Sequence, residues 1–185
     1  MEDTIVQVGD PVLREKAKHV LKKEFGSHAL KAVIKHMNTA LDAEKYGVAI
    51  AAPQIGVSKR IFVVSGHAFD TEKKDAGKIE ADAPVSEDKA FINPEISRLS
   101  RKKKSMSEGC LSVRGKYGHV VRHEKATVRA YDENGKPFVH HGSGLVAHIF
   151  QHEVDHLDGI LYIDKAEGVE DEKIEEGDTD KKGNE

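Results

Sequence analysis

The chain has 185 residues, one cysteine and a formal net charge of −3 at pH 7. This length predicts one domain. A single cysteine excludes a small fold held by internal disulfides and favours an intracellular, reducing setting. No apolar run approaches the ~20 residues that span a bilayer, and the start, Met1-Glu2-Asp3, is unlike a signal peptide, so we expect no membrane association.

The charge is unevenly distributed along the chain. Residues 166–185 contain nine acidic and three basic residues, so residues 1–165 carry a net charge of +3. The acidic segment has only two aliphatic side chains, Val169 and Ile174, and cannot bury enough apolar surface to offset the entropy of ordering. We therefore expect a single folded domain over residues 1–165 and a disordered acidic tail over residues 166–185.

The first third of the chain predicts a helix followed by an apolar strip. Apolar residues recur at helical spacing over residues 27–46, which predicts an amphipathic helix that ends at Gly47. Residues 47–54 read GVAIAAPQ and end in the amide of Gln54. Such a strip suits a wall against which a substrate backbone lies, with Gln54 donating to a developing oxyanion. The alternative is an ordinary tight strand packed on the first helix.

The middle of the chain predicts strands separated by an insertion. Residues 61–64 form a short apolar run typical of a buried strand. Residues 90–96 indicate another strand, whose end Pro94 demotes to an edge or a turn. Between them, residues 66–89 have scattered apolar residues with no helical or alternating period, and we interpret them as a surface insertion.

The last third predicts a hairpin and a helix. Residues 126–131 alternate and lead through Asn134-Gly135 into residues 137–140, which is a β-hairpin signature. Ser143 can cap a helix over residues 144–157. Strands in the middle with a helix at each end indicate an α+β domain.

This last helix carries the sequence HEVDH at residues 152–156. Residues four apart lie on one face of a helix, so His152 and His156 can bind one metal ion, and Glu153 can act as a general base toward a metal-bound water. Two alternatives stay open. His148, one turn earlier, could pair with His152 instead, or the end of the helix could simply face solvent.

A catalytic metal usually takes three protein ligands and leaves one position open. The obvious third ligand is the only cysteine, Cys110, which follows Gly109 in the run EGCLS at residues 108–112. A flexible glycine beside the thiol allows close approach of the backbone. The alternative is that Cys110 is a small buried hydrophobe, which is the more common role of a lone cysteine.

Together these three segments resemble one family, the peptide deformylases. That family carries a glycine-rich motif ending in Gln, the motif EGCLS, and QHExDHL followed one residue later by glycine. This chain has GVAIAAPQ at 47–54, EGCLS at 108–112 and QHEVDHLDG at 151–159. The resemblance covers roughly residues 4–165, apart from the insertion at about 66–89. It implies small antiparallel or mixed β-sheets packed around a C-terminal metal-binding helix, with an N-terminal helix.

The resemblance also implies roles for individual residues. One divalent metal ion would be bound by three residues: Cys110, His152 and His156. The native ion would be Fe²⁺, with Zn²⁺ or Ni²⁺ as alternatives. Glu153 would take a proton from the water that is the fourth ligand and later donate one to the leaving amine. Gln54 and the backbone N–H of Leu111 would stabilise the oxyanion. Six residues would line the substrate site: Val48, Ala49, Gly109, Leu145, His148 and Ile149.

The resemblance implies an amidohydrolase that removes the formyl group from formylmethionine at the start of newly synthesised polypeptides. The family usually has a second glycine at the position of Ala49 and often has proline at the position of Arg114, so the fit of the substrate is open. Two other functions are alternatives: a HExxH metallopeptidase, and a catalytically silent deformylase-like protein that binds formylated peptides.

We expect a cytoplasmic monomer whose partners are formylmethionyl nascent peptides. The basic run at residues 101–104 could make a transient contact with the ribosome, but a solvated loop or strand end is the favoured interpretation.

Overall fold

The computed structural model describes residues 5–77 and 85–171, and it confirms the α+β architecture. The helices of these residues are α1 (His28–Asp42), α2 (Gly66–Asp75) and α3 (Gly144–Leu157). The strands are β1 (Ala49–Ala51), β2 (Ile61–Val64), β3 (Lys89–Leu99), β4 (Lys103–Cys110), β5 (Val113–His123), β6 (Lys125–Tyr131), β7 (Pro137–Ser143) and β8 (Glu167–Asp171). Short 3-10 helices cover Pro11–Arg14, Lys22–Glu24, Ala52–Ile55 and Tyr162–Asp164.

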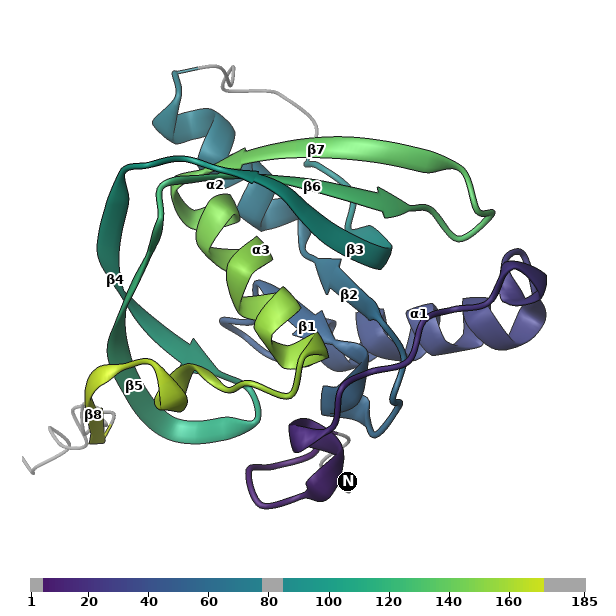
Figure 1. Ribbon diagram of the computed structural model, residues 1–185, viewed down its shortest axis with the longest axis horizontal. Coiled ribbons are helices and arrows are strands. Elements are labelled where there is room, and N and C mark those ends of the chain that lie inside the picture. The colour runs from purple at the N-terminus through teal and green to yellow at the C-terminus, as the bar shows by residue number, and fades with distance from the viewer. Residues whose placement is uncertain (1–4, 78–84, 172–185) are drawn as a thin grey trace, which may run out of the picture.

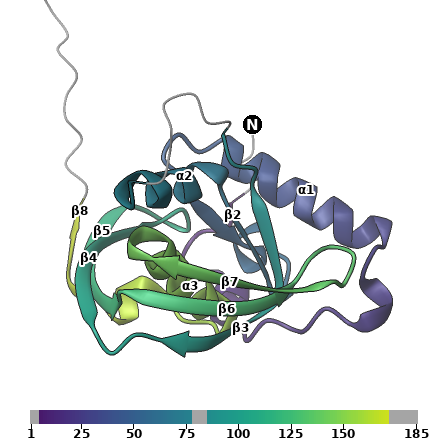
Figure 2. The ribbon, with the colours of Figure 1, turned by 90° about the horizontal axis from the view of Figure 1, so that it is seen from above.

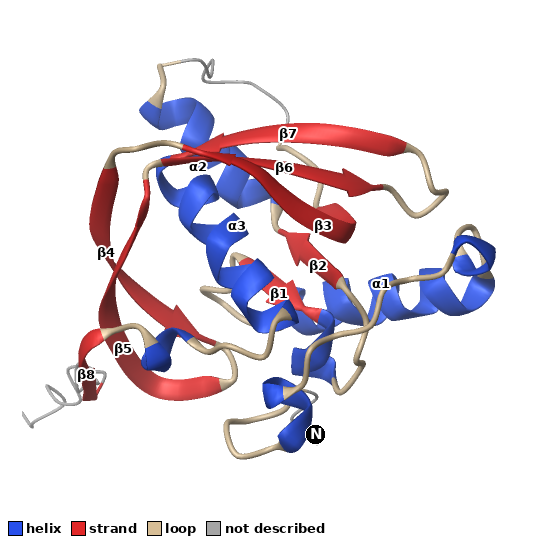
Figure 3. Cartoon of the chain, viewed as in Figure 1, coloured by secondary structure: helices blue, strands red, loops and turns tan. Residues whose placement is uncertain are grey.

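The strands form two antiparallel sheets, and α3 lies between them (Figures 1 and 3). The five-stranded sheet has the order β1-β2-β3-β6-β7, and the three-stranded sheet has the order β4-β5-β8. Every helix in the described part of the chain is too short or too polar to cross a lipid bilayer.

The apolar run of β2 is buried on both of its faces. Phe62 and Val64 belong to the core cluster that contains α3, whereas Ile61 and Val63 belong to the cluster that contains α1. Successive side chains of a strand point to opposite faces, so a strand covered on both sides requires an uninterrupted apolar sequence. This explains why the strand predicted over residues 61–64 has no polar position.

α1 begins where the sequence predicts and ends earlier. The hydroxyl oxygen of Ser27 accepts a hydrogen bond from the N–H of Leu30 at 3.2 Å, which caps the helix. The helix ends at Asp42, because the chain then turns back and the N–H of Gly47 donates to the carbonyl of Glu44 at 3.0 Å. The residues predicted to continue the helix therefore form a loop that leads into β1.

The prediction that Pro94 demotes the end of its strand to an edge or a turn agrees with the pairing of β3. The strand is central where it pairs with both β2 and β6, but it pairs with β2 only over residues 89–92, and from Glu95 to Leu99 it pairs with β6 alone, so this end is an edge. The register against β6 shifts between Ile92 and Glu95, and Asn93 has a left-handed backbone with φ of 49°. Proline has no N–H to donate to a ladder, and this irregularity accommodates it inside the strand.

The interpretation of residues 66–89 as an insertion without regular structure is wrong for its first half. Residues 66–75 form α2, which Ser65 caps by accepting a hydrogen bond from the N–H of His67 at 3.3 Å. Ala68 and Phe69 are buried in the same core cluster as α3. One apolar turn is enough to attach a short helix to an existing core. Two buried residues are too few to show a helical period in the sequence. Residues 78–84 lie outside the described residues.

The predicted hairpin and last helix are present as β6, β7 and α3. Ser143 occupies the N-cap of α3, but its hydroxyl does not cap the helix. Instead, Oε1 of Glu72 on α2 accepts hydrogen bonds from the backbone N–H of Ser143 at 2.5 Å and from its hydroxyl at 2.8 Å. A carboxylate at this end of a helix is favourable because it faces the positive end of the helix dipole. The insertion therefore supports the start of α3, which Figure 2 shows beneath α2.

The expectation of a disordered tail from residue 166 onward does not hold for residues 167–171, which form β8. This strand pairs with β5, Lys116 forms an ion pair with Asp171 at 2.6 Å, and the hydroxyl of Tyr117 donates to Glu170 at 2.8 Å. An added edge strand gains backbone hydrogen bonds and ion pairs without burying apolar side chains, so composition does not reveal it. Residues 172–185 lie outside the described residues.

Removal of β8 tests this attachment. A chain that ends at Lys165 should still fold, with a melting temperature lower by about 2–4 °C, the shift expected for a small loss of stability in a domain of this size. The double variant Glu170→Gln, Asp171→Asn keeps the backbone pairing and should show a smaller decrease in a thermal scan followed by circular dichroism. An unchanged melting temperature in the truncated chain would contradict a stabilising role for β8.

Candidate metal centre

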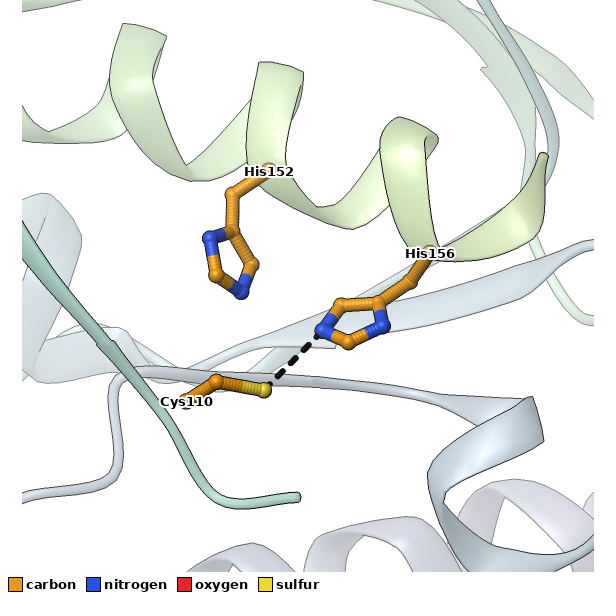
Figure 4. Close-up of side chains that lie close together, drawn as sticks. All are labelled: Cys110, His152 and His156. Carbon is orange, nitrogen blue, oxygen red and sulfur yellow. Dashed lines mark hydrogen bonds between the residues drawn. The ribbon is translucent and has the colours of Figure 1, made fainter. Parts of the chain in front are cut away.

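Two histidines of α3 and the cysteine at the end of β4 lie together. His152 and His156 are one helical turn apart, and their ring centroids are 4.9 Å apart. Sγ of Cys110 lies 3.2 Å from Nε2 of His156 (Figure 4). One ligand atom from each of the three residues lies within 4.8 Å of the others. A thiolate and two imidazoles at this separation can hold a single divalent cation such as Zn²⁺ or Fe²⁺.

His148 lies outside this group of three. In the described part of the chain, Cys110, His152 and His156 form the group of His, Cys, Asp and Glu side chains that is close enough to hold a metal ion. His148 is buried, and its Nδ1 lies 3.5 Å from Oε1 of Glu108 without a hydrogen bond to either ring nitrogen. The geometry therefore does not favour the alternative pair of His148 with His152.

A buried carboxylate orients His152. Nδ1 of His152 lies 2.9 Å from Oε2 of Glu108, so an N–H at Nδ1 donates to this carboxylate, and Nε2 is the ring nitrogen that faces Cys110 and His156. Glu108 is held in turn by Arg122, whose Nε and Nη2 donate to it at 2.5 Å and 2.9 Å. Nη1 of Arg122 also donates to Asp155 on α3 at 2.7 Å.

These contacts decide which groups are charged. Burial alone would raise the pKa of Glu108, but the nearby imidazoles of His148 and His152 and the guanidinium of Arg122 lower that pKa well below its usual range. Burial lowers the pKa of His152, yet hydrogen bonds with Cys110 and Glu108 outweigh it and raise the pKa to about 10. Nε2 of His152 therefore carries a proton near neutral pH, and a metal ion that binds this nitrogen has to displace it.

Glu153 differs from Glu108 in its surroundings. Its side chain is 3% exposed, and Oε2 has no hydrogen-bond partner. Burial raises the pKa of Glu153 to about 7. A carboxyl group with such a pKa can both accept and release a proton near neutral pH, which suits a general acid–base catalyst.

Hydrogen bonds fix Gln54 and Leu111 next to Cys110. Oε1 of Gln54 accepts a hydrogen bond from the N–H of Ala51 at 2.8 Å, which assigns the amide orientation. Nε2 of Gln54 then donates to Oγ of Ser112 at 3.2 Å and lies 3.5 Å from Sγ of Cys110. The carbonyl of Leu111 accepts a hydrogen bond from Nε2 of Gln7 at 3.0 Å, which ties this turn to the N-terminal segment.

The centre opens into a cavity of about 590 Å³. This volume is within the range of small-molecule sites. All six residues expected at the substrate site line it: Val48, Ala49, Gly109, Leu145, His148 and Ile149. Ala49 pairs with Val64 in regular strand geometry. Among the described residues other than glycine, only Asn93 has a positive φ, so Ala49 does not. The methyl group at position 49 therefore causes no backbone strain.

Sequence reasoning missed the residues that support the centre. The sequence motifs contain Glu108 and Asp155 only as letters of EGCLS and HEVDH, and no motif contains Arg122 or Gln7. Arg122 lies in β5 within an alternating pattern, where an arginine is expected to face solvent, yet its side chain is 4% exposed. No local pattern indicates that β5 turns this position toward Glu108.

Replacement of Arg122 tests the buried ion pair. Arg122→Met should lower the free energy of unfolding by about 3 kcal/mol, because the buried carboxylate of Glu108 loses its cation. Urea denaturation followed by circular dichroism measures this loss. Arg101→Met makes the same chemical change at an exposed position and should shift stability by less than about 0.5 kcal/mol. Equal losses in the two variants would show that the ion pair does not hold the fold together.

Comparisons with known proteins agree on one family. The family model described as polypeptide deformylase matches residues 2–172. The peptide deformylase of Desulforudis audaxviator is 43% identical over 162 residues, which cover 88% of this chain and 92% of that protein. The peptide deformylase of Halothermothrix orenii is 44% identical over 170 residues, which cover 92% and 97%.

A solved structure agrees with these relatives. The Met-Ala-Ser-bound class I type b peptide deformylase from Acinetobacter baumannii is similar with a TM-score of 0.74 and 32% sequence identity, over 87% of this chain and 96% of that chain. Sequence and fold lead to the same conclusion, which is that this chain belongs to the polypeptide deformylase family.

Proposed function

We propose that this protein hydrolyses the formamide bond of formylmethionine at the start of newly synthesised polypeptides and releases formate. The observation that carries this proposal is the cluster of Cys110, His152 and His156 beside the buried carboxyl group of Glu153, in a chain of this family. The Acinetobacter baumannii relative binds Met-Ala-Ser, a peptide with the amino-terminal residue that this reaction would expose.

Cys110, His152 and His156 would hold one divalent metal ion, and we propose Fe²⁺ as the native ion with Zn²⁺ or Ni²⁺ as substitutes. When bound, the cation supplies Lewis-acid polarisation of a water molecule and of the formyl oxygen. Glu108 keeps His152 oriented toward it through the 2.9 Å contact at Nδ1. Soft thiolate and borderline imidazole donors suit these transition metals better than they suit Mg²⁺ or Ca²⁺.

Glu153 would move the proton of the reaction. Its unpartnered Oε2 accepts a proton from the attacking water as the oxygen bonds to the formyl carbon. The same carboxyl group then protonates the amino nitrogen as the carbon–nitrogen bond breaks, which yields formate and a free amino terminus. The pKa of about 7 places both forms of Glu153 within reach at neutral pH.

Gln54 and the backbone N–H of Leu111 would stabilise the negative charge on the formyl oxygen. The Ala51 N–H holds Oε1 of Gln54, so Nε2 is the end of the amide that can donate to a substrate. Val48, Ala49 and Gly109 would contact the peptide backbone. Three residues of α3 would surround the methionine side chain: Leu145, His148 and Ile149.

The alternative functions have less support. A metallopeptidase that uses only the HExxH motif would leave Cys110 free, whereas its sulfur lies 3.2 Å from Nε2 of His156. A catalytically silent protein would be expected to lack at least one reacting group. Here the three metal ligands, Glu153 and Gln54 come together in or beside one pocket.

Formate release from formyl-Met-Ala-Ser tests the proposal. The assay should be anaerobic, because a thiolate-bound ferrous site is sensitive to oxygen, and metal content should be measured on the same sample. The wild-type chain should release formate. A preparation with about one metal ion per chain and no formate release would contradict the proposed function.

Glu153→Ala separates catalysis from metal binding. This variant should keep its metal and lose turnover by about 10²- to 10⁴-fold, because Glu153 transfers a proton and is not a ligand. Glu15→Ala removes an exposed carboxylate and serves as the control with unchanged turnover. Loss of the metal in Glu153→Ala would show that the roles on α3 are misassigned.

Cys110→Ser tests the third ligand. A hydroxyl is a much weaker donor than a thiolate, so dialysis against a chelator should remove the metal from this variant faster than from the wild type. Metal content by mass spectrometry provides the measurement, and Ser107→Ala, at an exposed position of β4 three residues before Cys110, serves as the control. Equal retention in Cys110→Ser and the wild type would require another third ligand.

Three further properties are part of the same proposal. We propose that the protein is a monomer and that it acts in the cytoplasm. A lone cysteine that supplies a metal ligand instead of a disulfide is consistent with that reducing compartment. A transient ribosome contact would use the basic run at residues 101–104, which covers the end of the β3–β4 turn and the first two residues of β4. Analytical ultracentrifugation of the metal-loaded protein, with and without ribosomes, tests the monomer and the contact together.

A further inference from the structure

The mouth of the pocket carries charged side chains outside the buried centre. The residues around Glu153 at the inner end are buried, whereas the outer rim is formed by the loop before β1 and by the start of β5. The rim carries three cations and one anion: Lys45, Arg114, Lys116 and Glu44.

An ion pair joins the two walls of this mouth. Nη2 of Arg114 donates to Oε1 of Glu44 at 2.7 Å, and Nη1 donates to Oε2 at 3.3 Å, so the guanidinium binds both carboxylate oxygens. Glu44 belongs to the loop between α1 and β1, whereas Arg114 lies in β5. The pair therefore fixes the loop that carries Lys45 and Tyr46 against the opposite wall.

Lys45 is the rim cation that the described residues leave without a carboxylate. Lys116 is paired with Asp171 at 2.6 Å, and Arg114 is paired with Glu44. Nζ of Lys45 lies 5.0 Å from the ring centre of Tyr46, and no carboxylate of residues 5–77 or 85–171 forms an ion pair with it. Within the described part of the chain, Lys45 is thus a rim cation without a carboxylate partner, next to the ring of Tyr46.

A peptide bound as proposed would pass this charge. Its formyl group would lie at the cluster of Cys110, His152 and His156 at the inner end, so the residues after methionine have to leave through the exposed rim. Their side chains are the part of the substrate that can reach Lys45. Here a carboxylate gains an ion pair, whereas an ammonium group is repelled.

We propose that the mouth selects formylmethionyl peptides with an acidic side chain at the second or third residue. Lys45 is the specificity-determining residue, and the ion pair of Glu44 with Arg114 positions the loop that carries it. This inference rests on the proposed function, because it names the peptides that the same site prefers. An exposed ion pair of this kind changes kcat/KM by about two- to fivefold and weakens with salt.

Matched peptides test the preference. Formyl-Met-Glu-Ser-amide and formyl-Met-Gln-Ser-amide have nearly the same shape, and amidation removes the terminal carboxylate, so they differ only in the charge at the second residue. At low ionic strength the wild type should cleave the Glu peptide with a kcat/KM about threefold higher than the Gln peptide. At about 0.5 M salt the ratio should approach one.

Charge reversal at the rim assigns the preference to Lys45. Lys45→Glu should invert the ratio so that the Gln peptide is preferred, mainly through KM. Lys136→Glu makes the same change in the β6–β7 turn and should leave both the ratio and the turnover unchanged. Arg114→Gln releases Glu44 from the opposite wall and should reduce the wild-type preference without inverting it.

The possible failures are distinguishable. Formate release at equal kcat/KM from both peptides, or an equal effect of Lys136→Glu and Lys45→Glu, would overturn the preference and leave the proposed function intact. No formate from either peptide, in a metal-loaded sample, would overturn the proposed function and the preference with it.

Discussion

A buried ion pair between Glu108 and Arg122 connects the parts of the candidate centre. Neither charge could stay in this environment without the other, because removal of an ion from water is costly unless a partner compensates. Glu108 also accepts a hydrogen bond from His152, and Arg122 donates to Asp155 on α3. The pair thereby links β4, β5 and α3. A shift of either strand relative to the helix would break this ion pair and leave a buried charge without a partner. The positions of the proposed ligands are therefore strongly constrained.

The helix that carries two of these ligands is held at both ends by other segments. At its start, Glu72 of α2 accepts the two hydrogen bonds donated by Ser143. At its end, the buried guanidinium of Arg60 donates to the carbonyl of Leu157 at 3.2 Å and to the carboxylate of Asp158 at 2.8 Å. These contacts satisfy backbone groups that a helix terminus leaves unpaired. A site built on a helix with fixed ends can keep ligand atoms within the narrow tolerance that metal binding requires.

The two ends of the pocket are built in different ways. At the inner end, burial determines the chemistry: it raises the pKa of Glu153 to about 7 and leaves the carboxyl oxygen Oε2 free for a proton. At the rim, exposed ion pairs such as that of Glu44 with Arg114 determine the charge. A change at the rim alters no buried contact, so the preference for a peptide can vary while the reaction stays the same. Arg114, at a position where the family often has proline, belongs to this rim and not to the buried end of the pocket.

The sequence by itself determined the features that depend on neighbours along the chain. It predicted the shared helical face of His152 and His156, the apolar strand β2 and the hairpin, because helix periodicity, strand composition and turn chemistry are local. Only the tertiary structure decided that β3 is central, that α2 and β8 exist, and that Arg122 pairs with Glu108. These depend on which segments meet. Glu108 lies 14 residues from Arg122 and 44 from His152, and strand register and helix packing bring the three side chains together.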